Sequence, residues 1–555
     1  MVDIPSRSNP CLLLVVVLAM FGTLLPVPGI AVQTSGNTAG ALALRKAAMT
    51  GQATCRDVQA PEGVFVKVFN DTVAEWVARP LDAGLVAEIR TALAPHLRIE
   101  LNPRGFAPAA TRTTEGEADS TNYDAIWVRD NVWVYYALAR DPERRADARR
   151  LLLALWDYYA TPAQVARFEA VIADPALALD QMAMPHIRFN GGTPKLDDVM
   201  VNGRPETWNH RQIDAHGLFF TALAEAASEG LLEPGDLTPA RFRVLVLYPR
   251  FLERISFDTY EDAGAWEELP RRNTSSIALA TRSLQAWRGL LDAKTGPARS
   301  FGDAFRARLG RLGPDAPAAW APSFLASLID RGMERVRHQL RLGGESPDYD
   351  PSDIRFRQAD AALLVLIQPS PLEGLTESEQ RAVLQIVRTL ERPAGILRYD
   401  LDSYQAGNYW NKPPASDDPA APALTGDTSS DAAFRWRLSQ LMPDTEAQWF
   451  FDSLCALARL HLAERTADPA LRRQDIHRAA VHIKRALGQI TGSAPAADGM
   501  PVREWQTPES INTVVLYGRR LPVPSPITPL NWAKAGLDLA LREYERIAIS
   551  KKELK

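Results

Sequence analysis

Apolar residues recur at three- and four-residue intervals along most of the chain, from about Leu85 to the C-terminal region. About a dozen segments have this spacing, which is typical of amphipathic helices, and most of them end in Gly, Pro or Asn. Examples are residues 83–97, 146–159, 217–232, 241–255, 275–291, 324–340, 380–391 and 448–464. Alternating strand patterns are few, and no fixed repeat period marks a solenoid. The sequence therefore predicts a large all-α protein, either a bundle or a ring of helical hairpins.

The size and composition allow two or three ordinary domains or one large helical toroid, and do not choose between them. The chain has 555 residues, of which 46% are hydrophobic and 23% charged, with a net charge of −4. These are ordinary values for a packed globular protein. The small net charge does not indicate a nucleic-acid or acidic-membrane partner.

The first thirty residues differ from the rest, because one arginine, Arg7, precedes an apolar run that ends in Pro, Gly and small residues. This pattern predicts a secretory signal peptide cleaved near Ala31, and hence a periplasmic or secreted protein with no membrane contact after cleavage. The alternative is an uncleaved membrane anchor. Cys11 lies at the start of the apolar run, which argues against lipid attachment there. We expect a signal peptide over residues 1–31, a weakly structured lead-in over 32–80 and a catalytic domain over 81–555.

The sequence allows one disulfide between the remaining cysteines, Cys55 and Cys455, although a large core does not need it. No Cys or His pair has the spacing of a metal site, so we expect no bound metal.

Five clusters at loop-to-helix junctions combine Trp with Arg, Asp or Glu. An indole face packs on the C–H face of a pyranose, and charged groups bind its hydroxyls, so these clusters suit a sugar site. Taken singly, most of them also fit helix capping, helix-dipole charges or a solvated surface. The density of hydroxyl-binding and stacking groups in residues 398–410, in contrast, is difficult to explain as scaffold. The clusters are Trp127–Asp130, Lys195 with Trp208–Asp214, Trp266–Glu268, Arg398–Trp410, and Trp505–Glu509 with Trp532.

In their order along the chain, the clusters resemble those of glycoside hydrolase family 15, the glucoamylase family. Helical relatives of that family include the phosphorylase kinase regulatory subunits. The resemblance runs from about Tyr123 to Trp532, and its strongest part is the R-Y-x-x-D-x-Y-x-x-G-N-x-W spacing of residues 398–410. It implies an (α/α)6 toroid, with six inner helices ringed by six outer ones. It also implies an exo-acting, inverting hydrolase that releases glucose from an α-glucoside without a cofactor.

The same resemblance assigns roles to residues. Glu267 corresponds to the general acid, and Glu509 to the general base, with Glu504 as a nearby competitor for that role. The substrate-binding positions that it implies are Trp127, Arg129, Asp130, Lys195, Trp208, Trp266, Glu268, Arg398, Asp402, Trp410 and Trp532.

Two departures from the family pattern bear on the site. Arg211 is displaced by one place and a proline is missing in the segment W-N-H-R-Q-I-D, and the residues after Glu268 read LPRRNTSS, which predicts an altered rim near the acid. Two alternatives stay open. One is a non-catalytic sugar-binding or regulatory protein that keeps the toroid, and the other is a different toroidal carbohydrate enzyme, such as a trehalase or phosphorylase.

Overall fold

Six helical segments form a closed inner ring. The computed structural model describes residues 39–110, 123–201, 203–406 and 429–549. Each inner segment contacts the next, and the last returns to the first, which closes the ring. In order, the ring contains α4 (Val128–Arg140), α7 (Ile213–Ser228), α9 (Thr274–Asp292), η6 (Ala361–Leu366), α15 (Asp452–Arg465) and α17 (Asn531–Tyr544).

An outer helix precedes each inner segment in the chain, so the fold is an all-α (α/α)6 toroid, as the resemblance implied. The outer helices are α3 (Ala83–Leu97), α5 (Arg145–Tyr159), α8 (Pro239–Arg254), α12 (Pro322–Leu342), α13 (Glu377–Arg388) and α16 (Pro469–Gly488). One inner position departs from the expected six helices, because η6 is a 3-10 helix of only 6 residues. Outside this scheme lie α6 (Pro162–Ala173), α10 (Gly296–Leu309) and α11 (Asp315–Ala319), with short turns at η2 (Pro142–Arg144), η3 (Pro175–Leu179), η4 (Pro234–Asp236) and the π-helical η7 (Glu545–Ile549).

The sequence of α7 explains why it is an inner helix. Nearly all of its residues are buried, polar ones included, as expected for a helix surrounded by other helices. It packs closely against α9, since a Cβ added at Gly217 would lie 2.5 Å from the backbone of Leu279. A glycine is therefore required at this crossing.

Short strands join the loops of the toroid. The larger sheet is antiparallel and has the order β11-β10-β9-β8-β7. Its longest members, β10 (Ser510–Leu516) and β11 (Arg519–Pro524), are joined by Tyr517 and Gly518, whose φ angles of 50° and 73° match a type I′ turn. The few strands expected from the sequence did not include this hairpin. The others are β7 (Glu391–Arg392), β8 (Gly395–Ile396), β9 (Gln448–Trp449), and the pairs β1 (Arg56–Gln59) with β2 (Phe65–Val68), β3 (Ile126–Trp127) with β4 (Arg188–Phe189), and β5 (Met200–Val201) with β6 (Arg204–Pro205).

The predicted lead-in is more regular than we expected. From residue 39 it forms α1 (Ala39–Thr50), the β1–β2 hairpin and α2 (Asp71–Val77). Apolar residues of α1 pack on β10 and β11, while α2 and β2 contact α16. The prediction of weak structure was wrong because these short elements gain their stability from the C-terminal part of the chain.

Two further points concern the described residues. Cys55 and Cys455 are both free thiols, so they do not form the disulfide that the sequence allows. No helix within residues 39–549, apart from the omitted stretches, is long and apolar enough to cross a membrane.

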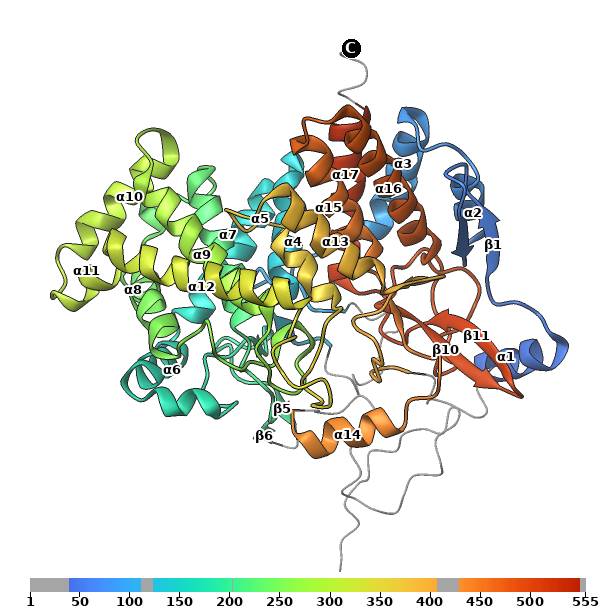
Figure 1. Cartoon of the computed structure of the whole chain (residues 1–555), viewed down its shortest axis with the longest axis horizontal. Helices are drawn as coiled ribbons and strands as arrows, with labels where there is room; N and C mark the ends of the chain where they lie inside the picture. The colour runs from blue at the N-terminus through green and yellow to red at the C-terminus, as the bar shows by residue number, and fades with distance from the viewer. Residues whose placement is uncertain (1–38, 111–122, 202, 407–428, 550–555) are drawn as a thin grey trace, which may run out of the picture.

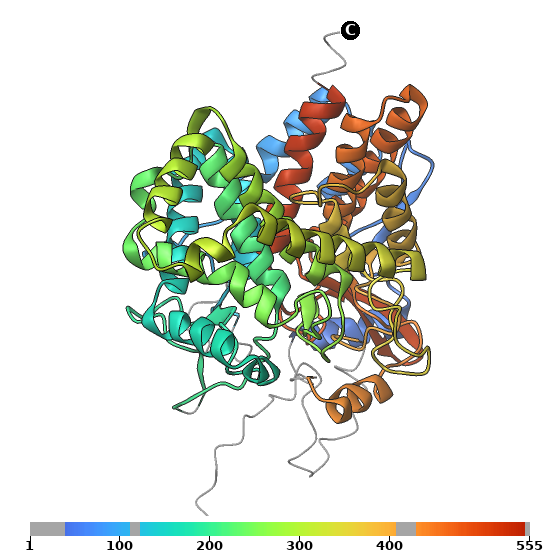
Figure 2. The same ribbon diagram turned by 60° about the vertical axis from the view of Figure 1, so that its left-hand side comes forward.

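Loops at one end of the ring carry the polar clusters. In Figures 1 and 2, the β10–β11 hairpin and α14 (Asp431–Ser439) lie toward the same end, below the inner helices. In an α-helical toroid, this is where connecting loops can converge on one site.

Candidate active site

The start of α4 links three of the clusters. Arg129, in the first turn of α4, donates from Nε to Asp214 at 2.7 Å and from Nη1 to Glu267 at 3.3 Å. The Nη2 atom of Arg129 donates to Gln212, which is the residue directly before α7. Segments that lie far apart in the sequence therefore meet at one buried guanidinium group.

Glu267 is the partly accessible carboxyl group of this cluster. It follows the 3-10 turn η5 (Gly264–Trp266) and has a φ of 59°, in the left-handed region that non-glycine residues rarely adopt. Its side chain is 16% exposed. Burial raises the pKa of Glu267 above its ordinary value, while Arg129 and a hydrogen bond from Trp127 act in the opposite direction. A partly exposed carboxyl group with a raised pKa is suited to general acid chemistry.

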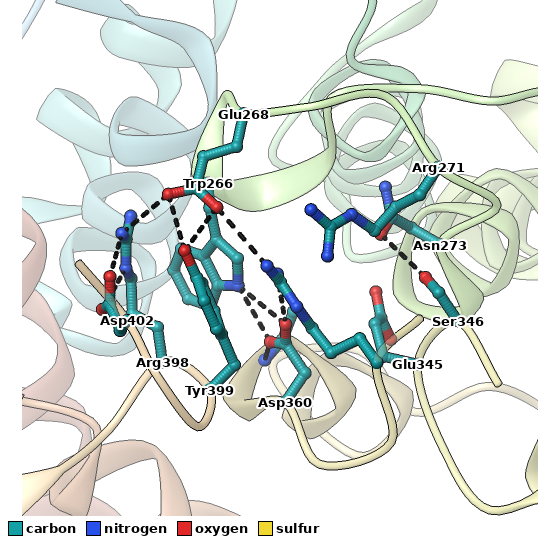
Figure 3. Close-up of polar contacts among 12 residues, drawn as sticks. Trp266, Glu268, Arg271, Asn273, Glu345, Ser346, Asp360, Arg398, Tyr399 and Asp402 are labelled. Carbon is teal, nitrogen blue, oxygen red and sulfur yellow. Dashed lines mark hydrogen bonds and ion pairs between the residues drawn. The ribbon is translucent and has the colours of Figure 1, made fainter. Parts of the chain in front are cut away.

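Glu268 lies in a very different environment, which Figure 3 shows. Its carboxylate accepts hydrogen bonds from Tyr399 at 2.6 Å, Arg398 at 3.0 Å and Arg437, with Arg357 at 3.5 Å. Burial disfavours the charged form, but the guanidinium groups outweigh it and hold the pKa of Glu268 well below its ordinary value. This carboxylate is permanently ionised and already fully bonded by the protein.

Two predicted binding residues belong to the same cluster. Asp402 binds the Arg398 guanidinium at 2.6 and 2.7 Å and accepts a hydrogen bond from Trp449 at 3.1 Å. The indole nitrogen of Trp266 donates to Asp360 at 2.9 Å. The structure thus brings Trp266, Glu268, Arg398 and Asp402 together, as the clusters suggested, whereas Trp410 lies outside the described residues.

Glu509 is a buried carboxyl group that directly precedes β10. It is 5% exposed and accepts hydrogen bonds from Tyr123 at 3.1 Å and from Gln405. Burial raises the pKa of Glu509 to about 8, although both hydrogen bonds favour the carboxylate. Its competitor Glu504 is exposed to solvent. Burial and hydrogen bonding therefore favour Glu509 over Glu504 as the second carboxyl group of the candidate site.

Aromatic contacts connect the two glutamates. The rings of Tyr123 and Trp127 are 5.3 Å apart, Tyr123 binds Glu509, and Trp127 binds Glu267. Asp130 lies within electrostatic range of both carboxyl groups, because it raises the pKa of Glu509 and is itself affected by Glu267. Burial is the main reason that the pKa of Asp130 rises to about 7. Tyr123, Trp127 and Asp130 therefore link Glu267 with Glu509.

Arg188 is a residue of this site that the sequence analysis missed. It pairs with Trp127 across the β3–β4 ladder, and its guanidinium carbon lies 4.6 Å from the Trp127 ring and 4.0 Å from the Trp208 ring. It also lowers the pKa of Glu267. Lys195, which we expected here, is exposed and is not brought to the cluster. A two-residue strand leaves too little periodicity for sequence analysis to detect this pairing.

Trp532, at the start of α17, lies beneath the site. Its ring stacks on Trp133 at 5.9 Å, and both residues line an interior cavity together with Arg129, Trp266 and Phe451. The cavity is largely apolar, with a guanidinium group at its edge. This arrangement offers a stacking surface below the charged groups.

The closed helical ring has the fold of the six-hairpin glycosidases, and its loops carry the two carboxyl groups described above. Residues 89–362 match the family model described as Glycosyl hydrolases family 15, and the chain belongs to that family.

Two relatives from Escherichia coli (strain K12) share parts of the sequence. One, named Uncharacterized lipoprotein YgeQ, is 37% identical over 163 residues, which make up 28% of this chain and 61% of that protein. The other, Putative protein YgeP, is 48% identical over 59 residues, or 11% of this chain and 60% of that protein. The chain thus matches about three fifths of the length of these relatives.

Among solved structures, the glucoamylase from Saccharomycopsis fibuligera is similar with a TM-score of 0.50 and 14% identity, over 84% of this chain and 96% of that chain. The Hormoconis resinae glucoamylase has a TM-score of 0.44 and 12% identity, over 84% of this chain and 73% of its own. At these identities the first likeness supports the fold and nothing finer.

Proposed function

We propose that this protein is an inverting, exo-acting glycoside hydrolase that releases glucose from the non-reducing end of an α-glucoside or α-glucan. The observation that carries the proposal is the pair Glu267 and Glu509, two carboxyl groups with raised pKa values on separate loops of one site. Residues around them supply both indole faces and guanidinium donors, which is the combination that a sugar ring requires.

In the proposed reaction, Glu267 gives its proton to the glycosidic oxygen as the bond to the anomeric carbon breaks. Glu509 removes a proton from the water that attacks that carbon from the opposite face. The products are the free sugar with inverted configuration and the shortened glycan. Inversion requires space for this water, which corresponds to carboxyl groups about 6.5–9.5 Å apart.

The base must be ionised to act, and burial opposes ionisation of Glu509. The hydrogen bonds from Tyr123 and Gln405 favour the carboxylate form but do not outweigh burial, so we expect the ionised base to become available as the pH approaches about 8. On the other side of the site, Arg129 fixes the orientation of Glu267 while Asp214 holds the guanidinium group in place. Holding the acid in one orientation is worth several orders of magnitude in well-positioned reactions.

Roles follow for the other predicted positions. Trp127, Trp208, Trp266 and Trp532 provide stacking faces around the sugar. Arg129, Asp130 and Arg398 bind its hydroxyls, with Glu268 and Asp402 keeping Arg398 in position.

The experiment is incubation of the mature chain with a panel of α-linked glucosides, with release and anomeric form of glucose followed by NMR. We expect β-glucose to appear first. Glu267→Gln should lower kcat/KM by about a hundred- to ten-thousand-fold while leaving saccharide binding intact. Glu504→Gln is the matched control and should retain full activity. A melting-temperature shift with maltooligosaccharides but no glucose release would instead identify a non-catalytic sugar-binding protein, and a requirement for phosphate would identify a phosphorylase.

We also propose export through cleavage after the apolar N-terminal run, and one catalytic domain over residues 81–555. Mass spectrometry of the protein isolated from its native compartment would test cleavage near Ala31. An intact N-terminus in the membrane fraction would support the anchored alternative.

A further inference from the structure

Arg271 has a buried guanidinium group that lacks a partner. Its side chain is 2% exposed, and neither Nη1 nor Nη2 has a hydrogen-bond partner among the residues that the structure describes. Only Nε donates, to the Leu269 carbonyl at 3.3 Å. Glu268 and Asp360 stabilise its charge electrostatically, but neither is hydrogen-bonded to it. A buried charge without a bonded counter-charge is unfavourable, so its environment needs an explanation.

The neighbouring charges are already matched without Arg271. Arg398 binds Asp402, Arg437 binds Glu268, and Arg357 binds Asp360 at 3.0 Å. Three arginines thus face three carboxylates, and Arg271 is a fourth cation. Figure 3 shows its guanidinium group pointing into this cluster without a bond.

Glu345, the next nearby carboxyl group, does not supply the missing charge. It binds Ser275, through the backbone amide and the hydroxyl. Burial and the nearby Asp360 raise the pKa of Glu345 well above its ordinary value, which favours its neutral form. Arg271 itself remains protonated, because burial and the adjacent Arg357 lower its pKa only to about 10.

Helix α14 packs beside this cation. The ring of Phe434, on α14, lies 5.6 Å from the Arg271 guanidinium carbon, and Arg437 of the same helix reaches Glu268. A cation–π contact contributes only about 1–2 kcal/mol, which is less than the cost of burying an unpaired ion. A true counter-ion is therefore required.

We propose that Arg271 anchors an anion-binding site beside Glu268, in which one small anion accepts hydrogen bonds from Arg271 next to Arg357. The low exposure of Arg271 limits the occupant to about the size of a halide ion or a single carboxylate. This anion comes either from solution, as chloride, or from an acidic substituent on a bound saccharide. The site goes beyond the proposed glycosidase function, because anion binding here requires no hydrolysis.

The test uses the mature chain dialysed into sodium methanesulfonate, whose anion is bulky, and then titrated with chloride at constant ionic strength. Excess broadening of the ³⁵Cl NMR line and the melting temperature are the two readouts. In the wild type we expect saturable broadening and a rise in melting temperature of a few degrees, on the scale of ligand stabilisation at high occupancy. In a parallel arm, a maltooligosaccharide carrying a uronate is compared with its neutral counterpart.

Arg271→Met should abolish both responses, and without chloride it should melt above the wild type, because the unpaired charge is gone. Arg271→Lys keeps the charge and should retain a weaker response, which distinguishes loss of the site from misfolding. Arg272→Met is the matched control, since Arg272 already pairs with Asp348 at 2.8 Å and Glu261 at 3.2 Å.

A response to the acidic saccharide alone that disappears in Arg271→Met would assign the anion to the substrate. The proposal is overturned if neither anion gives a response that depends on Arg271, or if Arg271→Met is no more stable than the wild type without chloride. Neither readout uses glucose release, so failure of the glycosidase proposal would be seen separately.

Discussion

Replacing Glu509, the proposed general base, by Gln tests whether burial raises the pKa of the carboxyl group directly before β10. Burial raises the pKa of Glu509 from 4.5 to about 8. Between these two values, the folded protein keeps a proton that the unfolded chain has lost. Gln is neutral and nearly isosteric, so the variant mimics the protonated side chain at every pH.

The difference in stability between the two proteins then depends on pH. Below the unfolded pKa, both states of the wild type carry the proton, and wild type and Glu509→Gln have similar free energies of unfolding. As the pH rises from 4.5 to about 8, the wild type loses about 1.4 kcal/mol per pH unit relative to the variant. Above that range the difference is constant at about 5 kcal/mol in favour of the variant.

Chemical denaturation followed by tryptophan fluorescence, from about pH 5 to about pH 9, measures this difference. Other titrating groups are common to both proteins and cancel. Glu504→Gln is the matched control, because Glu504 is exposed and lies nearby in the sequence, and its difference from the wild type should not change with pH. A difference between wild type and Glu509→Gln that stays constant over this range would refute the assignment.

Three more predictions concern the site and the ring. Tyr123→Phe removes a hydrogen bond to the Glu509 carboxylate, so the acidic limb of the kcat/KM profile should move up by about 1–2 pH units. Arg188→Met removes a cation that lowers the pKa of Glu267, the proposed general acid, so the basic limb should move upward and kcat/KM should fall about tenfold. Lys195→Met should leave both unchanged. Gly217→Ala forces a Cβ against the backbone of α9 and should lower the free energy of unfolding by about 1–3 kcal/mol.

Each of these has a matched comparison. Tyr404→Phe also removes a hydroxyl group, which lies 3.0 Å from the Tyr123 hydroxyl but is not bonded to Glu509. This variant should move the acidic limb much less. An equal shift in both variants would contradict the role of Tyr123. An alanine at Gly289 meets nothing within 4 Å, so it should not destabilise α9, and equal losses at Gly289 and Gly217 would argue against the close crossing.

The helical ring was predictable from the sequence, because long amphipathic segments carry a strong periodic signal. The exception is η6, whose residues Ala361–Leu366 replace an inner helix. A run of six apolar residues fits a helix turn or a strand equally well. Its packing between α9 and α15 determines which of the two conformations residues 361–366 adopt. The β10–β11 hairpin has a clearer sequence signal, because its strands contain β-branched residues and a Tyr517-Gly518 turn joins them. This hairpin was not predicted from the sequence.

The candidate site was predictable where several functional residues lie close together in sequence, as in Trp127–Asp130 and Trp266–Glu268. It was not predictable where partners come from separate elements. Arg188 reaches the site through a two-residue strand pair, and Arg437 reaches Glu268 from α14. Such contacts are set by the three-dimensional course of loops, and no local pattern of residues encodes them.

Glu267 and Glu268 show how backbone conformation determines the environment of a side-chain carboxyl group. They are chemically identical neighbours, yet burial raises the pKa of the first while three arginines lower that of the second. The left-handed conformation of Glu267 turns the chain, so one carboxyl group remains partly exposed beside Arg129 and the next is enclosed by the arginine cluster. A strained residue persists only where its surroundings hold it in place. Here the ion pairs of Glu268 provide that hold, because they fix the loop immediately after Glu267. The ion-paired Glu268 therefore supports the loop that carries Glu267, whose pKa is raised by burial.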